Sequence, residues 1–291
     1  MDDERDASGP GGLPADGHVH SEWSWDATLG SMEETCRRAV EIGLPAVAFT
    51  EHLDLTPFRA GFLVGTRPDL VHDGVLTAPP FDVEGFRAAV ERCRGLFPGL
   101  RVLAGVEVGQ PHLHRAALRA ILSSGGFDRV IGSLHCLPDG DVAAEPWEPV
   151  PTAPGRRRRP RVPRRDPARG RRVRRVRGAR ARRLPAAVVA HRAGPFEPRR
   201  FEDEFRQALR AVAAGDRALE LNTRLPLDPL LLQWFREEGG RRVTFGSDAH
   251  EPAAVGAGLA DAAATAWAHG LRPGRRPEAP WQVGAHQHAA G

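Results

Sequence analysis

Short runs of apolar residues recur along the chain, and nearly every run ends in polar side chains. The runs are about four to six residues long, which is typical of strands buried on both faces of a parallel sheet. In chain order they lie in GLPAVAFTEH, LRVLAGVEVG, FDRVIGSLHC, LPAAVVAH, RALELNTR and RRVTFGSDAH. A first strand is expected before them, leading into DGHVHSEWSWD at residues 16–26.

Amphipathic segments between these runs carry the start signals of helices. Ser31 and Glu34 have the spacing of a capping box, and Asp82 is a suitable N-cap for the segment after it. Asp228 precedes Pro229, and proline is favoured at the first position of a helix. A further helix is expected in FEDEFRQALRAVAAG, which has acids in its first turn.

Strand, polar end and helix repeat about seven times, which predicts an α/β fold of the (β/α) barrel type. A doubly wound open sheet is the alternative, but no GxGxxG or GxxxxGK[ST] phosphate-binding loop supports it. We expect a disordered N-terminus at 1–14, a single barrel domain at 15–270 and a disordered tail at 271–291. An Arg/Pro-rich segment at 151–185 interrupts the barrel domain.

The net charge of +4 originates in one segment of the chain. All 41 basic residues are arginine, and 16 of them lie in residues 156–183 beside a single acid, Asp166. The remainder holds 25 arginines against 36 acids, so its net charge is −11. A generally basic, nucleic-acid-binding protein is therefore not indicated, and nucleic acid could bind only through residues 156–183.

The sequence predicts a protein that does not span a membrane. No run of about 18 apolar residues occurs, and the acidic start MDDERDASGPGG lacks the apolar centre of a signal peptide. Cys36, Cys93 and Cys136 are scattered without CxxC spacing, so we expect reduced thiols. These features favour the cytoplasm.

Ligand-type side chains stand at the carboxyl ends of the predicted strands. In a parallel barrel these ends converge on one face, where such folds place their chemistry. His18 and His20 are two residues apart on a strand and point to the same side, as do Asp248 and His250. Mixed imidazole and carboxylate ligands suit zinc, manganese or iron. The full set of candidate metal ligands is His18, His20, Asp26, His52, Glu107, His135, His191, Asp248 and His250.

Each of these residues has an ordinary interpretation when taken alone. An isolated histidine, such as His72 or His112, is more often a loop residue or a satisfied core group than a ligand. The joint pattern, in which ligand-type residues follow strand after strand, is what favours a metal site.

Six motifs in this order resemble those of the PHP (polymerase and histidinol phosphatase) family: DGHVHSEWSWD, FTEHLD, GVEVG, FDRVIGSLHCL, LELNT and FGSDAH. The similarity covers about residues 16–150 and 195–260 and is greatest to the monofunctional histidinol-phosphatase branch. It implies a distorted, TIM-like (β/α)7 barrel that holds three divalent metal ions.

The resemblance also implies ligands and chemistry. The first metal would be held by His18, His20, Glu107 and Asp248, the second by Glu107, His135 and His191, and the third by Asp26, His52 and His250. The implied reaction is hydrolysis of L-histidinol phosphate, a small phosphate monoester, in histidine biosynthesis. A metal-bridging hydroxide would attack phosphorus in line, so no protein nucleophile is required. Arg224 is either a phosphate contact or a surface arginine, and Asp16 is expected to orient an imidazole.

Residues 150–194 depart from the family pattern. They should supply a barrel helix and the strand before His191, yet they are rich in Arg and Pro and have no hydrophobic period. Three interpretations compete: a disordered insertion that binds polyanions, an inert solvated loop, or a local shift of reading frame in a GC-rich gene, which we favour. A barrel segment at about 150–194 is therefore expected to be disordered or disrupted, because so many arginines cannot be buried without partners.

Three functional hypotheses remain open. The first is a metal-dependent histidinol phosphatase, and the second is a PHP-type phosphoesterase with another substrate. The third is an inactive, damaged homologue whose Arg-rich segment binds polyanions. The sequence does not predict the oligomeric state.

Overall fold

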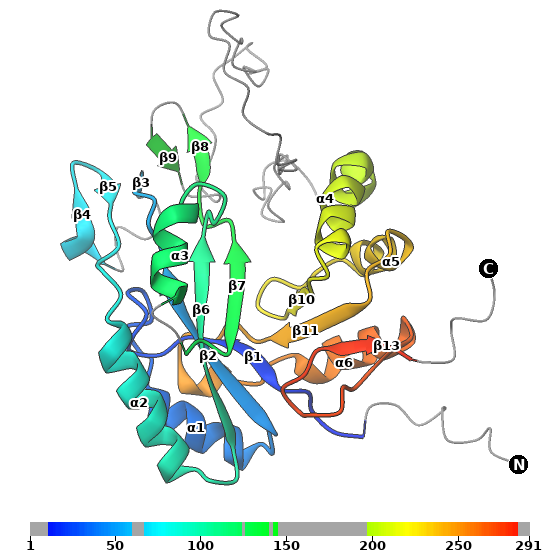
Figure 1. The fold of residues 1–291 in the computed structure, drawn as a ribbon, viewed down its shortest axis with the longest axis horizontal. Coiled ribbons are helices and arrows are strands. Elements are labelled where there is room, and N and C mark those ends of the chain that lie inside the picture. Colours follow the sequence, from blue (N-terminus) through cyan, green and yellow to red (C-terminus); the bar gives the residue numbers. More distant parts are fainter. Residues whose placement is uncertain (1–10, 60–66, 124–125, 140–141, 145–196, 285–291) are drawn as a thin grey trace, which may run out of the picture.

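A computed structural model describes residues 11–59, 67–123, 126–139, 142–144 and 197–284 (Figure 1). Within these residues, no helix is long and apolar enough to cross a membrane. The Arg-rich segment and His191 lie outside the described residues. So do residues 1–10, which are part of the N-terminal stretch 1–14 that we expect to be disordered.

Four parallel strands form the first sheet, in the order β1-β2-β6-β7. They are β1 (Asp16–Val19), β2 (Ala46–Leu53), β6 (Arg101–Gly109) and β7 (Arg129–Ser133). The central pair is buried almost throughout, as expected for parallel strands covered on both faces.

Three helices connect these strands: α1 (Met32–Glu41), α2 (Val83–Leu96) and α3 (Arg115–Ser123). The predicted caps of the first two are confirmed, because Ser31 accepts a hydrogen bond from Glu34 N and Asp82 accepts one from Gly85 N. Both helices lie together on one side of the first sheet (Figure 1).

The second sheet has the order β10-β11-β13-β12. β10 (Leu219–Asn222) and β11 (Arg242–Gly246) are parallel, whereas β13 (Trp281–Val283) and β12 (Leu271–Arg272) are antiparallel additions. Its helices are α4 (Glu202–Ala214), α5 (Pro229–Glu237) and α6 (Leu259–Ala268), with short 3-10 turns η3 (Pro198–Phe201) and η4 (Pro252–Ala254).

The prediction of a disordered tail is wrong for residues 271–284. Leu271 and Trp281 are buried in the main core, and Gly270 adopts a positive φ of 77° that turns the chain from α6 into β12. Because only a few apolar residues are spaced among arginines and prolines there, the local sequence has no strand pattern. The domain therefore extends beyond residue 270.

The two sheets meet where β1 approaches the segment after β11. Val19 and Ala249 form a parallel bridge, and the His20 N–H donates to the Ala249 carbonyl at 2.8 Å. The Asp248 N–H donates to the His18 carbonyl at the same distance. The parallel strands thus curl into a half-barrel, and in the described part of the chain β7 and β10 each pair on one side only.

A small third sheet has the order β4-β5-β3-β9-β8 and lies beyond the carboxyl ends of β6 and β7 (Figure 1). Its strands have only two or three residues each, and η2 (Pro68–Leu70) precedes β4. They are β3 (Phe58–Arg59), β4 (Val71–His72), β5 (Val75–Leu76), β8 (Leu137–Asp139) and β9 (Val142–Ala144). Phe58 and Leu76 pack with Trp25 in a separate apolar cluster, which fixes this sheet beside the loop after β1.

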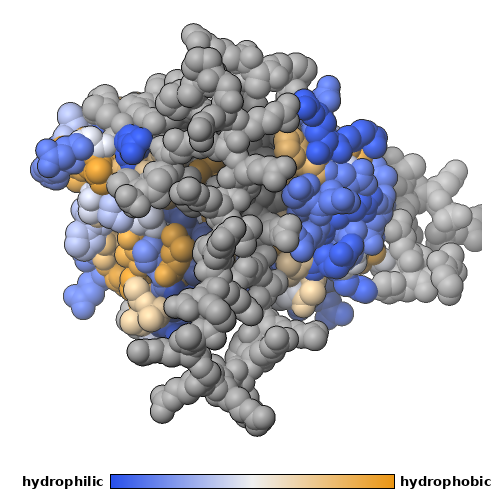
Figure 2. All heavy atoms as spheres, turned by 90° about the horizontal axis from the view of Figure 1, so that it is seen from above, coloured by the Kyte–Doolittle hydropathy of each residue, from blue (hydrophilic) through white to orange (hydrophobic). Residues whose placement is uncertain are grey.

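One large core joins the first and second sheets to their helices. Phe49, Phe86 and Met32 fill it beneath the first sheet, and Trp234 and Phe235 fill it beneath the second. Seen from above, hydrophilic residues gather on the side of α4 and α5 (Figure 2). Because this core packs against both sheets, it holds the carboxyl ends of their parallel strands around a shared centre.

Candidate metal centre

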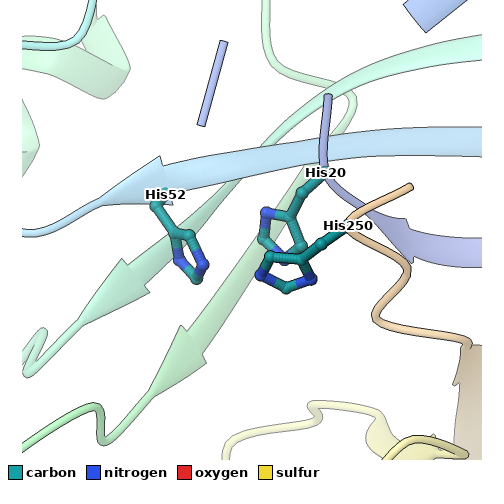
Figure 3. Close-up of side chains that lie close together, drawn as sticks. All are labelled: His20, His52 and His250. Carbon is teal, nitrogen blue, oxygen red and sulfur yellow. The ribbon is translucent and has the colours of Figure 1, made fainter. Parts of the chain in front are cut away.

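Three imidazole rings from separate strands meet at the carboxyl ends of the parallel strands. His52 lies near the end of β2, while His20 and His250 come from the segments after β1 and β11 (Figure 3). The His20 ring centroid is 4.1 Å from that of His52 and 4.3 Å from that of His250. Two of the three are more than nine-tenths enclosed, with 0% and 9% of the side chain exposed for His20 and His52.

The first group of ligand-type atoms combines His18, His20 and Glu107, whose ligand atoms all lie within 4.8 Å of one another. Glu107 Oε2 is 3.2 Å from His18 Nε2 and 3.5 Å from His20 Nε2. Asp248 Oδ1 approaches the same two nitrogens at 3.6 and 3.2 Å. Two nitrogens and two carboxylates therefore surround one point.

Hydrogen bonds on the far side of each ring orient the nitrogens of this group. Ser24 Oγ donates to Glu51 at 2.6 Å, so it accepts the Nδ1–H of His20 at 2.9 Å. His18 Nδ1 donates to Glu220 at 2.7 Å, since a carboxylate only accepts. Both histidines therefore present Nε2 to the centre, and the two Nε2 atoms lie 3.0 Å apart. A proton or a cation must lie between them, which fits a metal site.

The second group extends from the other side of Glu107. His135 Nε2 is 3.1 Å from Glu107 Oε1, and its Nδ1 donates to Asp54 Oδ1 at 2.7 Å. His52, Asp54 and His135 also have ligand atoms within 4.8 Å of one another. The two oxygens of Glu107 thus face two different groups, as a carboxylate shared by two ions would.

The third group contains Asp26, His52 and His250. Asp26 Oδ2 is 3.2 Å from His52 Nε2 and 3.2 Å from His250 Nε2. The second oxygen of this carboxylate, Oδ1, is buried without a hydrogen-bond partner. A buried, unpartnered carboxylate oxygen is costly, so this atom also fits a cation ligand.

Burial and charge shift the pKa values of these groups in opposite directions. Burial, reinforced by the neighbouring His52 charge, lowers the pKa of His20 to about 3 and keeps it neutral. Burial also disfavours the His135 cation, but Glu107 and Asp54 outweigh it and raise the pKa of His135 to about 10. Against burial, the imidazoles hold the pKa of Glu107 well below its usual range. His20 and Glu107 are therefore deprotonated at neutral pH, which is the state in which an imidazole nitrogen and a carboxylate bind a divalent cation.

The structure brings together eight of the nine predicted metal ligands; the ninth, His191, lies outside the described residues. Arg224 lies at the rim, with 53% of its side chain exposed and its Nη1 donating to the Asp248 carbonyl at 3.1 Å.

Three carboxylates in or beside the centre escaped prediction: Glu51, Asp54 and Glu220. Asp54 follows His52 by two residues, so strand alternation carried the signal that could have found it. Glu220 lies two residues before Asn222 on one strand, so the same alternation could have found it. Asn222 Nδ2 lies 3.3 Å from a carboxylate oxygen of Glu220 and 3.3 Å from one of Asp248. Glu51 gave no signal beyond its place beside His52.

The expectation that Asp16 orients an imidazole is wrong. Its carboxylate accepts backbone hydrogen bonds from Ser247 and Gly256, both at 2.9 Å. Asp16 therefore fastens β1 to the segments after β11, and Glu220 is the group that orients His18.

Residues 16–224 match the family described as the PHP domain, which is most of the chain. The chain belongs to the PHP family. No curated protein matches it in sequence.

Two solved structures are similar to this PHP chain. One is a histidinol phosphate phosphatase (HisK) from Lactococcus lactis subsp. lactis Il1403 in complex with zinc, L-histidinol and phosphate. It has 18% identity and a TM-score of 0.58, over 86% of this chain and 94% of that one. The other, from Listeria monocytogenes, is assigned as a histidinol phosphatase; it has 15% identity and a TM-score of 0.58, over 85% of this chain and 99% of that one. At such identities the likeness establishes the fold.

Proposed function

We propose that this chain is a metal-dependent phosphomonoesterase with three divalent ions at the carboxyl ends of a (β/α)7 barrel. The convergence of eight ligand-type side chains from five strands and the segments that follow them, in three groups around Glu107, supports this proposal most strongly. In that barrel β1 and β11 are neighbours, and the strand expected before His191 would stand between β7 and β10. That strand lies outside the described residues.

The proposed ligands follow the three groups. The first ion is held by His18, His20, Glu107 and Asp248, and the third by Asp26, His52 and His250. The second is held by Glu107 and His135, with His191 as the further ligand that the sequence predicts. Zinc, manganese or iron suits such a donor set, and the Lactococcus lactis protein is named in complex with zinc.

Divalent ions at such a site neutralise phosphate charge and lower the pKa of a bound water. The protein's own groups prepare the centre for that chemistry. Ser24 and Glu51 fix the His20 ring, and Glu220 fixes the His18 ring, so both Nε2 atoms face inward. Ser24 and Ser133 donate to buried carboxylates at 2.6 and 2.5 Å, so neither hydroxyl is free to act as a nucleophile.

The substrate that we propose is L-histidinol phosphate, hydrolysed in the cytoplasm as a step of histidine biosynthesis. The name of the Lactococcus lactis protein and of its bound L-histidinol and phosphate supports this choice. Arg224 stands 3.9 Å from Asp248 Oδ1 with half of its side chain exposed, a position from which it could contact a phosphate oxygen.

Phosphate release from L-histidinol phosphate tests the proposal. The full chain is stripped of metal, reloaded with Zn²⁺ or Mn²⁺, and assayed beside the metal-free protein and His20→Ala. We expect release only from the reloaded wild type. Release from other phosphate monoesters but not from L-histidinol phosphate would keep the phosphoesterase and reject the substrate. Metal binding without release from any monoester would reject the activity and favour a damaged homologue.

A further inference from the structure

A pocket of about 350 Å³ opens beside the third group of ligands. Asp26, Asp248 and His250 line one part of it, so the pocket is continuous with the candidate metal centre. Its volume lies in the range of roughly 300–1,000 Å³ that is usual for sites of small molecules. A molecule bound at the centre through its phosphate would extend its remaining atoms into this space.

The walls of the pocket differ in charge. Arg224 lines it as a cation, whereas Glu251 lines it as an exposed carboxylate next to the candidate ligand His250. Among the described residues the Glu251 carboxylate makes no ion pair and accepts no hydrogen bond. Its backbone is nevertheless fixed, because the Glu251 carbonyl accepts from Ala254 N at 3.1 Å at the start of η4. Glu251 is therefore a positioned negative charge without a partner.

Leu29 gives the pocket an apolar wall. Its side chain is 71% exposed, which is unusual for a leucine in a segment that is itself held in place. Backbone hydrogen bonds from Thr28 to Asp26 and from Gly30 to Ala27 fix the loop around it. Ala254 and Ala257 add further small apolar surface. The pocket thus offers an apolar surface and one unpaired carboxylate to the same ligand.

We propose that this pocket binds the alcohol part of the phosphate monoester and that Glu251 selects alcohols that carry a positive charge. Leu29 packs against the carbon skeleton, and the Glu251 carboxylate pairs with an ammonium group. The substrate class is the phosphate ester of a small amino alcohol, of which L-histidinol phosphate is one. This inference rests on the proposed function and adds to it a residue that determines specificity.

The test compares one cationic and one neutral ester with the metal-loaded full chain. Glu251→Gln keeps the shape of the side chain and removes its charge. We expect kcat/KM for L-histidinol phosphate to fall about fivefold through a higher KM, because an ion pair on an exposed wall contributes about that factor. With 4-nitrophenyl phosphate, kcat/KM should stay unchanged. Glu84→Gln, on the exposed start of α2, is the matched control and should leave kcat/KM unchanged for both substrates. An equal fall of kcat/KM for both esters in Glu251→Gln, or no fall for either ester, would overturn the inference.

A binding measurement separates this inference from the proposed function. By calorimetry, Glu251→Gln should raise the Kd of L-histidinol about fivefold and leave the Kd of its analogue without the amine unchanged. This result, in a chain that releases no phosphate from L-histidinol phosphate, would support the cation pocket and reject the substrate assignment. Equal Kd values of L-histidinol for wild type and variant, or no binding of L-histidinol to either, would overturn the cation pocket.

Discussion

Each imidazole of the first group is oriented by an acceptor on its far nitrogen. His20 is held by Ser24, and His18 is held by Glu220. Such hydrogen bonds fix the tautomer and the ring angle, and a lost partner reduces metal affinity by roughly 10–100-fold. The proposed metal site therefore depends on residues that touch no ion.

Ser24→Ala should weaken the affinity for Zn²⁺ by about 10-fold or more, because His20 loses the acceptor that keeps Nε2 inward. His20→Ala should lower the metal content further, since it removes a ligand. Competition with a chromogenic chelator measures both affinities. Ser123→Ala, at the exposed end of α3, is the control and should match wild type. Wild-type affinity in both Ser24→Ala and His20→Ala would remove this group from the site.

The sequence predicts the inner groups of the centre better than the residues that hold them. His18 and His20 are spaced two residues apart at the end of the first strand, and Asp248 follows the apolar end of another strand, so the pattern that predicts them is local. Glu220 and Asp54 act through contacts across 202 and 81 residues of chain, to His18 and His135. Such contacts exist only after the strands have assembled, so no local pattern specifies them.

At the scale of elements, β11 passes so close to β1 that only glycine fits at its end. A Cβ on Gly246 would lie 2.3 Å from His18 Cβ and 3.3 Å from Glu220 Cδ. The strand end is therefore shaped around the His18–Glu220 pair.

Gly246→Ala should destabilise the fold by roughly 1–3 kcal/mol through overpacking and should also lower the metal content, because His18 must move. Gly95→Ala is the contrasting variant. Gly95 lies in α2 with nothing within 4 Å of an added Cβ, so this change should stabilise by roughly 0.5–1 kcal/mol. Urea denaturation measures the stability of both variants, and metal analysis of the purified proteins measures their metal content. Unchanged stability and metal content in Gly246→Ala would contradict the close packing.

Arg206 links α4 to α5 through Glu237 and Glu238 and lies over the Trp234 ring at 5.3 Å. The Arg206 guanidinium lowers the pKa of Glu237, so the pair stabilises the fold above the ordinary pKa of glutamate, about 4.3, and this stabilisation is lost as pH falls.

Arg206→Met keeps an apolar contact with Trp234 and removes the charge. Wild type should be slightly more stable than Arg206→Met at neutral pH, and the difference should shrink as the pH falls below about 4.3 or as salt is added. Denaturation at several pH values checks this. A difference that grows in acid would contradict the ion pair.

Among the elements, the parallel strands and the capped helices were predictable because their patterns are local. β3, β4 and β5 were not, since two residues are too few to show a period. β12 and β13 lie among arginines and prolines, and they are stabilised by pairing beside β11 and by the burial of Leu271 and Trp281 in the core.

At the scale of the whole molecule, the first and second sheets meet between β1 and the segment after β11, and Asp16 fastens this join. This side chain is fully buried and accepts from Ser247 N and Gly256 N, about 230–240 residues away in the chain. The candidate ligands Asp248 and His250 lie between those two donors, so the join also positions the centre.

Asp16→Asn should cost roughly 1–3 kcal/mol of stability, because one buried N–H loses its acceptor. Asp203→Asn, exposed on α4, should change stability by less than about 0.5 kcal/mol. Thermal unfolding of both variants checks the contrast. Equal melting temperatures for Asp16→Asn and wild type would show that the join does not depend on this carboxylate.

The decisive measurement is anomalous X-ray scattering from crystals of the zinc-loaded protein. We predict peaks between the Nε2 atoms of His18 and His20, beside Glu107 Oε1 and His135, and among Asp26, His52 and His250. Zinc bound only elsewhere on the chain, or no peak at any of these three places, would contradict a metal centre at the mouth of the half-barrel.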